Sequence, residues 1–188
     1  MGKSKQLLPL GDRPVIARCL ESIRGAGIDD VVVVIAPNGG EVIKAIEAFP
    51  VTVVRNETPN TDMSQSVRVG FRKVSPAACG VFVCLADQPL VKAETLMTMR
   101  LCFKEKPGMI ILPVYNGKKG HPSLLPRKLL AEIETLPTLR DLIEKHSGEL
   151  FCLEVVDEGV VLDMDTQEDY KRMLKRFSAV ALARVSDS

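Results

Sequence analysis

GVFVCLADQP, residues 80–89, is a short apolar run that ends at an acid, Asp87, and a proline, Pro89. A continuous apolar run of this length, bounded by turn residues, is typical of a strand that is covered on both faces, as in a parallel sheet. In open parallel sheets, ligands bind beyond the carboxyl ends of the strands. We therefore predict that Asp87 lies at the ligand-binding edge of such a sheet.

The rest of the chain alternates between similar apolar runs and amphipathic segments. Strands are predicted over residues 31–36, 51–54, 80–86, 109–114 and 151–156. Helices are predicted over residues 14–25, 41–48, 62–74, 93–106, 125–136, 139–146 and 166–177. Strands that alternate with helices of this length form βαβ units with right-handed crossovers. The pattern predicts an α/β fold with a mostly parallel sheet.

The composition favours one globular domain and excludes several classes of protein. The chain has 188 residues, 46% of them hydrophobic, and we expect a single domain over residues 1–188. Its 25 Lys and Arg against 24 Asp and Glu leave no basic excess for nucleic acid. No apolar run approaches the roughly 20 residues of a membrane span, and no secretory signal is readable at the N-terminus. The five cysteines form no C-x-x-C pair, so we expect reduced core thiols in a cytoplasmic protein.

Acidic residues in predicted loops are candidate metal ligands. Asp163 and Asp165 lie two residues apart, so in an extended segment their side chains point the same way, and they could complete a site with Asp87. Mg²⁺ prefers carboxylate oxygens, and one or two suffice where phosphates supply the rest. Asp87 could equally be a turn residue that caps the next helix, and one of the other acids could merely start the last helix.

Two basic residues are candidates for binding phosphate or substrate. Lys5 precedes the first predicted helix and could reach a phosphate as a mobile point charge, although a lone Lys is usually solvated. His121, in the segment GKKGHP, is held extended by Pro122 and could present its imidazole to a substrate. A loop histidine without a role is the equal alternative.

The segment DMSQSVRVG, residues 62–70, carries hydroxyls and a cation at the start of a predicted helix. Ser64, Ser66 and Arg68 there could bind an anion or a ribose, because a helix N-terminus favours negative charge. N-capping by a hydroxyl, together with a surface arginine, is the other interpretation.

Taken together, five motifs in chain order resemble the MobA-like nucleotidyltransferase family. They are MGKSKQLLPL (1–10), DMSQSVRVG (62–70), LADQP (85–89), GHP (120–122) and LDMDTQED (162–169). Each motif alone is weak, but five in order are specific, and they run from Met1 to about Leu174. The sequence is most similar to the molybdenum cofactor cytidylyltransferases within this family. The resemblance implies a Rossmann-like three-layer α/β sandwich of the nucleotide-diphospho-sugar transferase type.

The resemblance also implies a reaction and the residues that carry it. The implied reaction is Mg²⁺-dependent transfer of CMP from CTP to a terminal phosphate of molybdopterin, with pyrophosphate as leaving group. Lys5, Asp87 and His121 match catalytic positions. Asp87 and Asp165 match the metal ligands, with Asp163 as a substitute. The residues that match nucleotide-binding and acceptor-binding positions are Lys5, Ser64, Ser66, Arg68, Gln88 and His121.

One departure from the family concerns the N-terminal side. Family members carry a central strand and a glycine-rich loop just ahead of the M-G-x-x-K motif, and residues 1–188 begin inside that motif. Without the strand, backbone groups of its neighbours stay unpaired unless something fills the gap. A late start codon is the explanation that we favour over a degenerate chain or cover by another chain. A second departure is Asp62, where the family often has Gly.

Several functions therefore remain open. GTP or another nucleotide could replace CTP, because the absent loop helps to read the base. The chain could instead be an inactive relative that binds a molybdoenzyme or its cofactor, or an accessory to that enzyme. A phosphoacceptor domain of the response-regulator kind is disfavoured, because no acidic pair follows the first predicted strand. Neither nucleic acid nor membrane is expected as a partner.

Overall fold

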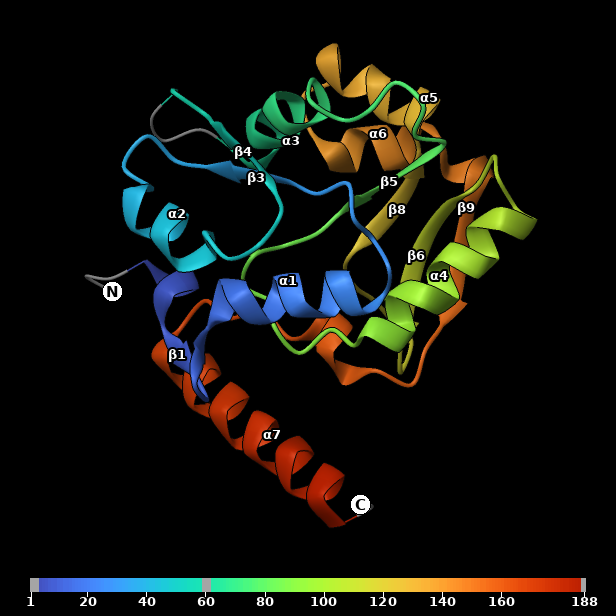
Figure 1. Ribbon diagram of the computed structural model, residues 1–188. Coiled ribbons are helices and arrows are strands. Elements are labelled where there is room, and N and C mark those ends of the chain that lie inside the picture. Colours follow the sequence, from blue (N-terminus) through green and yellow to red (C-terminus); the bar gives the residue numbers. More distant parts are fainter. Residues whose placement is uncertain (1–3, 59–61, 187–188) are drawn as a thin grey trace.

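The computed structural model describes residues 4–58 and 62–186, and Figure 1 shows the arrangement of its elements. The strands are β1 (Pro9–Leu10), β2 (Arg13–Pro14), β3 (Val32–Ile35), β4 (Thr52–Arg55), β5 (Gly80–Val83), β6 (Ile110–Tyr115), β7 (Lys118–Lys119), β8 (Ser123–Pro126) and β9 (Leu150–Glu154). The α-helices are α1 (Val15–Gly25), α2 (Gly40–Ile46), α3 (Met63–Phe71), α4 (Ala93–Glu105), α5 (Arg127–Leu130), α6 (Leu139–Lys145) and α7 (Gln167–Ser186). The 3₁₀ turns are η1 (Lys5–Leu7), η2 (Ala131–Glu134), η3 (Ser147–Glu149) and η4 (Glu158–Val161).

The central strands form two sheets. β3 and β4 pair in parallel, with Val32 opposite Thr52. In the larger sheet β8 lies between β5 and β6 and is antiparallel to both, so β5 and β6 run the same way. β9 pairs in parallel with β6, and β7 forms a hairpin with the end of β6. The structure is thus a mixed α/β fold in which β8 alone interrupts the parallel order of the long strands.

Helices cover both faces of the larger sheet. Alternate residues of a strand point to opposite faces, and β6 shows this clearly. Ile110 and Leu112 pack in a cluster with residues of α5 and α6, whereas Ile111 packs with Met99 and Phe103 of α4. Figure 1 accordingly shows α3, α5 and α6 on one side of the strands, with α1 and α4 on the other. The predicted three-layer α/β sandwich is confirmed.

The prediction of one helix over residues 125–136 is wrong. Residues 123–126 form β8, and only short turns, α5 and η2, follow it. Leu124 packs toward α4 and Leu125 toward α6, so both are buried as in a central strand. The spacing of leucines in this stretch also suits a helix, and periodicity alone cannot separate a short buried strand from a helix. The stretch forms a strand because β5 and β6 offer it backbone hydrogen-bond partners on both sides.

The expectation that the cysteines are core thiols is also wrong for most of them. All five are free, but Cys79, Cys84 and Cys152 are exposed, and Cys19 and Cys102 are partly exposed. Protein atoms surround Cys84, and this burial raises the pKa of its thiol to about 12. Its exposed surface faces a large open pocket, which it lines together with Cys19. The apolar residues beside these cysteines correctly indicate strands and helices, but they do not show that the cysteine side chains themselves are buried.

The β1–β2 hairpin and the first half of α7 lie side by side at one side of the fold. The β1–β2 hairpin packs against α7, and Leu10 and Val15 share a buried cluster with Met164 and Met173. The Tyr170 hydroxyl donates a hydrogen bond to the carbonyl of Pro9 at 2.5 Å. Within residues 4–58 and 62–186, no helix combines the length and the apolar character needed to cross a membrane.

Candidate functional site

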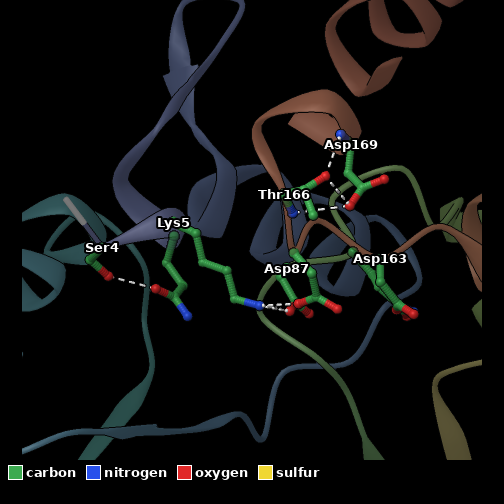
Figure 2. Close-up of polar contacts among 9 residues, drawn as sticks. Ser4, Lys5, Asp87, Asp163, Thr166 and Asp169 are labelled. Atoms are coloured by element: carbon green, nitrogen blue, oxygen red, sulfur yellow. Dashed lines mark hydrogen bonds and ion pairs between the residues drawn. The ribbon is translucent and has the colours of Figure 1, made fainter. Parts of the chain in front are cut away.

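Three charged side chains from distant parts of the sequence meet beyond the carboxyl end of β5. The Lys5 Nζ atom donates to Oδ2 of Asp87 at 2.5 Å and to Oδ1 of Asp165 at 2.9 Å. Figure 2 shows the Lys5 side chain extended toward the carboxylate of Asp87, with dashed lines for the bonds of its ammonium group. Burial alone lowers the pKa of Lys5, but the bonds to the two aspartates outweigh it and raise the pKa above its ordinary value. The ammonium therefore stays charged and balances one of the two acids.

Local structure explains why each of these residues projects here. Lys5 opens the turn η1, and Asp87 follows β5 directly after the segment Cys84–Ala86. Asp165 precedes α7, whose start is fixed by a capping box. In that box the amide of Asp169 donates to the hydroxyl of Thr166 at 3.1 Å, and Thr166 donates back to the Asp169 carboxylate (Figure 2). The capping box holds the backbone that carries Asp165.

Gln88 links Asp163 to the same region. Gln88 is only 4% exposed, and its Nε2 atom donates to Oδ1 of Asp163 at 2.6 Å. Its other polar atom, Oε1, is buried and has no hydrogen-bond partner among the residues that the structure describes. Buried polar atoms are paired in nearly all cases, and an exception beside charged residues indicates a place for a ligand or water.

His121 lies close to these acids. Its amide donates to the carbonyl of Val160 at 2.8 Å, and its Nδ1 atom is buried without a partner in the described part of the chain. Burial lowers the pKa of His121, against the opposing charges of Asp163 and Asp87. At neutral pH the imidazole is therefore uncharged and can donate or accept one hydrogen bond at each nitrogen.

Lys5, Asp87, Gln88, Asp163, Asp165 and His121 thus come together as one group. The other predicted site residues lie on α3 and already have protein partners. Ser64 is buried and its hydroxyl accepts from the amide of Leu139 at 3.3 Å. The Ser66 hydroxyl accepts from Nδ2 of Asn56 at 3.2 Å.

Arg68 binds backbone carbonyls at the end of η2. Its Nε atom donates to Ile133 at 2.7 Å, and its Nη2 atom donates to Leu136 at 2.6 Å and to Pro137 at 2.9 Å. These bonds fix the segment between η2 and α6 against α3. The Arg68 Nη1 atom also donates to Oε1 of Gln65, three residues earlier on α3, at 3.2 Å.

The charged group fits a metal that is shared with phosphates rather than held by protein alone. In residues 4–58 and 62–186, no three His, Cys, Asp or Glu side chains are grouped to hold a metal ion. Asp87 and Asp165, however, already converge on one cation, the Lys5 ammonium. Mg²⁺ bound by one or two carboxylates plus substrate phosphates needs no more than such a pair.

Residues 1–150 match the sequence profile of the MobA-like NTP transferase domain. The chain belongs to this family. The resemblance inferred from the five motifs is confirmed. The family and the fold are those of nucleotidyltransferases.

Two curated proteins show how MobA-like relatives align with this chain. The molybdenum cofactor cytidylyltransferase of Escherichia coli K12 is 23% identical over 131 residues, which are 69% of this chain and 66% of that protein. The alignment therefore spans slightly under two thirds of that relative. The nicotine blue oxidoreductase of Paenarthrobacter nicotinovorans is 24% identical over 181 residues, which are 90% of this chain and 87% of that protein.

A solved structure extends the likeness to nearly the whole chain. The crystal structure of Rv0371c from Mycobacterium tuberculosis H37Rv, in complex with manganese, is 31% identical in sequence. It superposes with a TM-score of 0.73 and covers 93% of each chain.

Sequence reasoning missed Asp157, which positions the loop beside His121. Asp157 is 2% exposed, and its Oδ2 atom accepts from the Lys92 amide at 2.9 Å and the Thr95 hydroxyl at 2.7 Å. Its Oδ1 atom accepts from the amide of Gly159 at 3.0 Å, next to the Val160 carbonyl that holds His121. The D-E-G sequence at 157–159 is a turn signal that could have suggested this role.

Proposed function

We propose that residues 1–188 form one nucleotidyltransferase domain that transfers CMP from CTP to a phosphate of molybdopterin type. The observation that carries the proposal is the meeting of Lys5, Asp87 and Asp165 beyond the carboxyl end of β5. Open α/β folds bind their ligands at such an edge. The E. coli relative named for molybdenum cofactor cytidylyl transfer supports the choice of CTP and acceptor.

Asp87 and Asp165 are the residues that would hold Mg²⁺, with Asp163 beside them. The manganese complex of Rv0371c supports a divalent cation in this family. When bound with a nucleotide, Mg²⁺ supplies charge neutralisation over the phosphate oxygens. Gln88 holds Asp163 by its Nε2 atom, so this acid stays oriented toward the site.

The reaction requires alignment and neutralisation more than covalent help from the protein. An oxygen of the acceptor phosphate forms a bond to the α-phosphorus of CTP, and the bond from that phosphorus to pyrophosphate breaks. Lys5 binds a non-bridging phosphate oxygen and offsets the charge that builds on it. The free Nδ1 atom of His121 and Oε1 atom of Gln88 bind the acceptor.

The nucleotide side of the proposed site is α3. Ser66, near the start of this helix, faces the nucleotide, while Ser64 and Arg68 support the helix through the bonds described above. A molybdoenzyme or its chaperone is the proposed recipient of the product, in the cytoplasm. GTP is the alternative nucleotide donor, and the binding experiment described next distinguishes it from CTP.

Calorimetry of nucleotide binding to the 188-residue chain tests the proposal. CTP and GTP are titrated with Mg²⁺ into the wild type, the Asp87→Asn variant and a Glu134→Gln control, whose carboxylate pairs with Arg72 outside the site. We expect saturable, Mg²⁺-dependent binding of CTP in the wild type and the control only. Binding of GTP but not of CTP would show that GTP is the nucleotide donor. If the chain binds a nucleotide but releases no pyrophosphate when molybdopterin is added, its function is binding and not transfer.

A further inference from the structure

The outer face of α4 carries a small apolar patch. The inner face of this helix is buried against the sheet through Leu96, Met99 and Phe103. On the opposite face, Met97 is 48% exposed and Leu101 is 59% exposed. These two residues are four positions apart, so their side chains are neighbours on the helix surface. The patch stays open to solvent in the described fold.

Two opposite charges flank the patch at equal spacing. Glu94 lies three positions before Met97, and Lys104 lies three positions after Leu101. Spacings of three, four and three residues keep all four exposed side chains on one narrow stripe of the helix, and we call these four residues the ridge. Among the residues that the structure describes, the side chains of Glu94 and Lys104 have no ion-pair partner. The ridge therefore presents an unpaired anion and an unpaired cation on either side of an apolar centre.

The ridge is complementary to a second copy of itself. Position 99 is the midpoint between Met97 and Leu101, and it is also the midpoint between Glu94 and Lys104. When two α4 helices pack antiparallel about a two-fold axis at this level, Met97 faces the partner's Leu101. In the same arrangement Glu94 faces the partner's Lys104. An interface with two-fold symmetry requires such a match, because the same patch is used on both subunits.

The charges favour this partner and this direction. In a parallel pair, each Glu94 would meet the partner's Glu94 and each Lys104 the partner's Lys104, and contacts between like charges are unfavourable. A different partner would need a cation, two apolar residues and an anion at the same spacing in the reverse order. The helix α4 itself carries that pattern.

Arg100, the cation closest to the axis along the helix, is turned away from the ridge. Its Nη1 atom donates to the carbonyl of Ala26 at 2.5 Å and to that of Gly27 at 3.0 Å. These bonds direct the guanidinium toward the end of α1, so it does not compete with Lys104 for a glutamate. The Thr98 hydroxyl, on α4 beside the patch, donates to a carbonyl of its own helix at 2.8 Å. Neither polar side chain is left without a partner when the ridge is covered.

We propose that two copies of this chain associate through the ridge, with their α4 helices antiparallel. One exposed helix from each copy buries an area at or below the low end of specific interfaces, about 1,200 Å² in total, so the dimer is weak and reversible. None of the ridge residues belongs to the charged group of Lys5, Asp87 and Asp165. The dimer thus depends on neither the nucleotide nor the metal, and each copy keeps its own site.

Sedimentation equilibrium of the 188-residue chain, from about 5 to about 500 µM, tests the proposal with charge reversals. Glu94→Lys and Lys104→Glu each place like charges at both ends of the interface, whereas the double variant restores opposite charges. The helix α2 supplies matched controls, because Glu41 lies in its first turn as Glu94 does in α4, and Lys44 lies in its last turn as Lys104 does. The controls are Glu41→Lys and Lys44→Glu, and circular dichroism checks that each variant is folded.

We expect the wild type, both α2 controls and the double variant to dimerise with a Kd on the order of 10⁻⁴ M, and each single ridge variant to dimerise at least about tenfold more weakly. An equimolar mixture of the two single ridge variants should associate as the wild type does, because the lysines of one then face the glutamates of the other. A wild type that stays monomeric throughout this range would overturn the proposal. A dimer that the single reversals leave unchanged would also overturn it, as would a double variant that fails to recover.

Discussion

The Nζ atom of Lys5 lies 2.5 Å from Oδ2 of Asp87, although the two residues are 82 positions apart in the sequence. The same ammonium also binds Asp165, which lies a further 78 positions along the chain. A protein cation thus occupies the point where two carboxylates converge. Any divalent ion or phosphate that binds there must exchange partners with Lys5, and this gives the first two predictions their direction.

Asp87→Asn should abolish most of the transfer activity while the fold persists. The amide cannot supply an anionic ligand or balance Lys5, so we expect pyrophosphate release to fall about 10²-fold or more. The rate is measured at saturating CTP and Mg²⁺, beside Glu134→Gln as a surface control. A variant with wild-type rate would remove Asp87 from the proposed site.

Lys5→Gln should lower the rate and yet tighten metal binding. The side chain keeps a hydrogen-bond donor but loses the charge that offsets the phosphates, so the rate falls by about 10²-fold. Without the ammonium, Asp87 and Asp165 are free to bind Mn²⁺, and the affinity of the nucleotide-free protein for Mn²⁺ rises. Calorimetric titration with MnCl₂ measures this, and weaker binding than in the wild type would contradict it.

Arg68→Lys tests whether this residue supports the fold or binds the nucleotide. Lys cannot reproduce the fork that binds the carbonyls of Ile133, Leu136 and Pro137. We expect the free energy of unfolding to fall by about 2 kcal/mol, with little change in CTP affinity. Urea denaturation and calorimetry give the two values, and Arg72→Lys, at the exposed residue that follows α3, is the control. Lost affinity at unchanged stability would place Arg68 on the nucleotide.

His121 should make the fold less stable in mild acid. Its pKa in the folded protein lies below the unfolded value near 6.5, because burial disfavours the charged form. As the pH falls through 6.5, the unfolded chain binds a proton that the folded chain resists, so unfolding becomes easier. The loss of unfolding free energy between pH 7.5 and pH 5.5 should be smaller in His121→Gln than in the wild type. An equal loss in both would show that other groups carry the effect.

Asp157→Ala should destabilise the protein and disturb the loop that holds His121. The substitution leaves the Lys92 and Gly159 amides and the Thr95 hydroxyl without their shared acceptor. We expect a loss of about 2–3 kcal/mol in unfolding free energy. Asp157→Asn, which retains one acceptor oxygen, should lose less. Thermal unfolding of both variants measures the difference, and equal losses would argue against the capping role.

The sequence is a reliable guide where local pattern and tertiary contact agree. The strand β3 and the helices α1 and α4 end within one residue of their predicted ranges, whereas β5 begins at the predicted Gly80 and ends at Val83, three residues before the predicted end. Asp87 could be placed at the edge of a sheet because it follows an apolar run directly. The stretch at β8 could not be resolved, because its leucines suit a strand and a helix equally and only β5 and β6 decide.

The partners of individual side chains were beyond sequence reasoning. Nothing in the order of residues indicates that Gln88 binds Asp163, 75 positions away, or that Arg68 binds the carbonyls near Leu136. These contacts depend on how the helices pack against the sheet. A shift of one residue along a helix or strand would give these side chains different partners. Motif order identifies which residues matter, while only the fold shows which of them touch.

The bond between Tyr170 and Pro9 has a consequence for the order in which the protein matures. Asp165 lies 160 positions after Lys5, and the helix α7 that packs against the β1–β2 hairpin follows Asp165. The sheet and its covering layers can form while synthesis continues, since domains fold as their segments emerge. The charged group, in contrast, assembles only after Asp165 has been synthesised. A nascent chain thus cannot form the charged group of Lys5, Asp87 and Asp165 until the sheet that supports it has been synthesised.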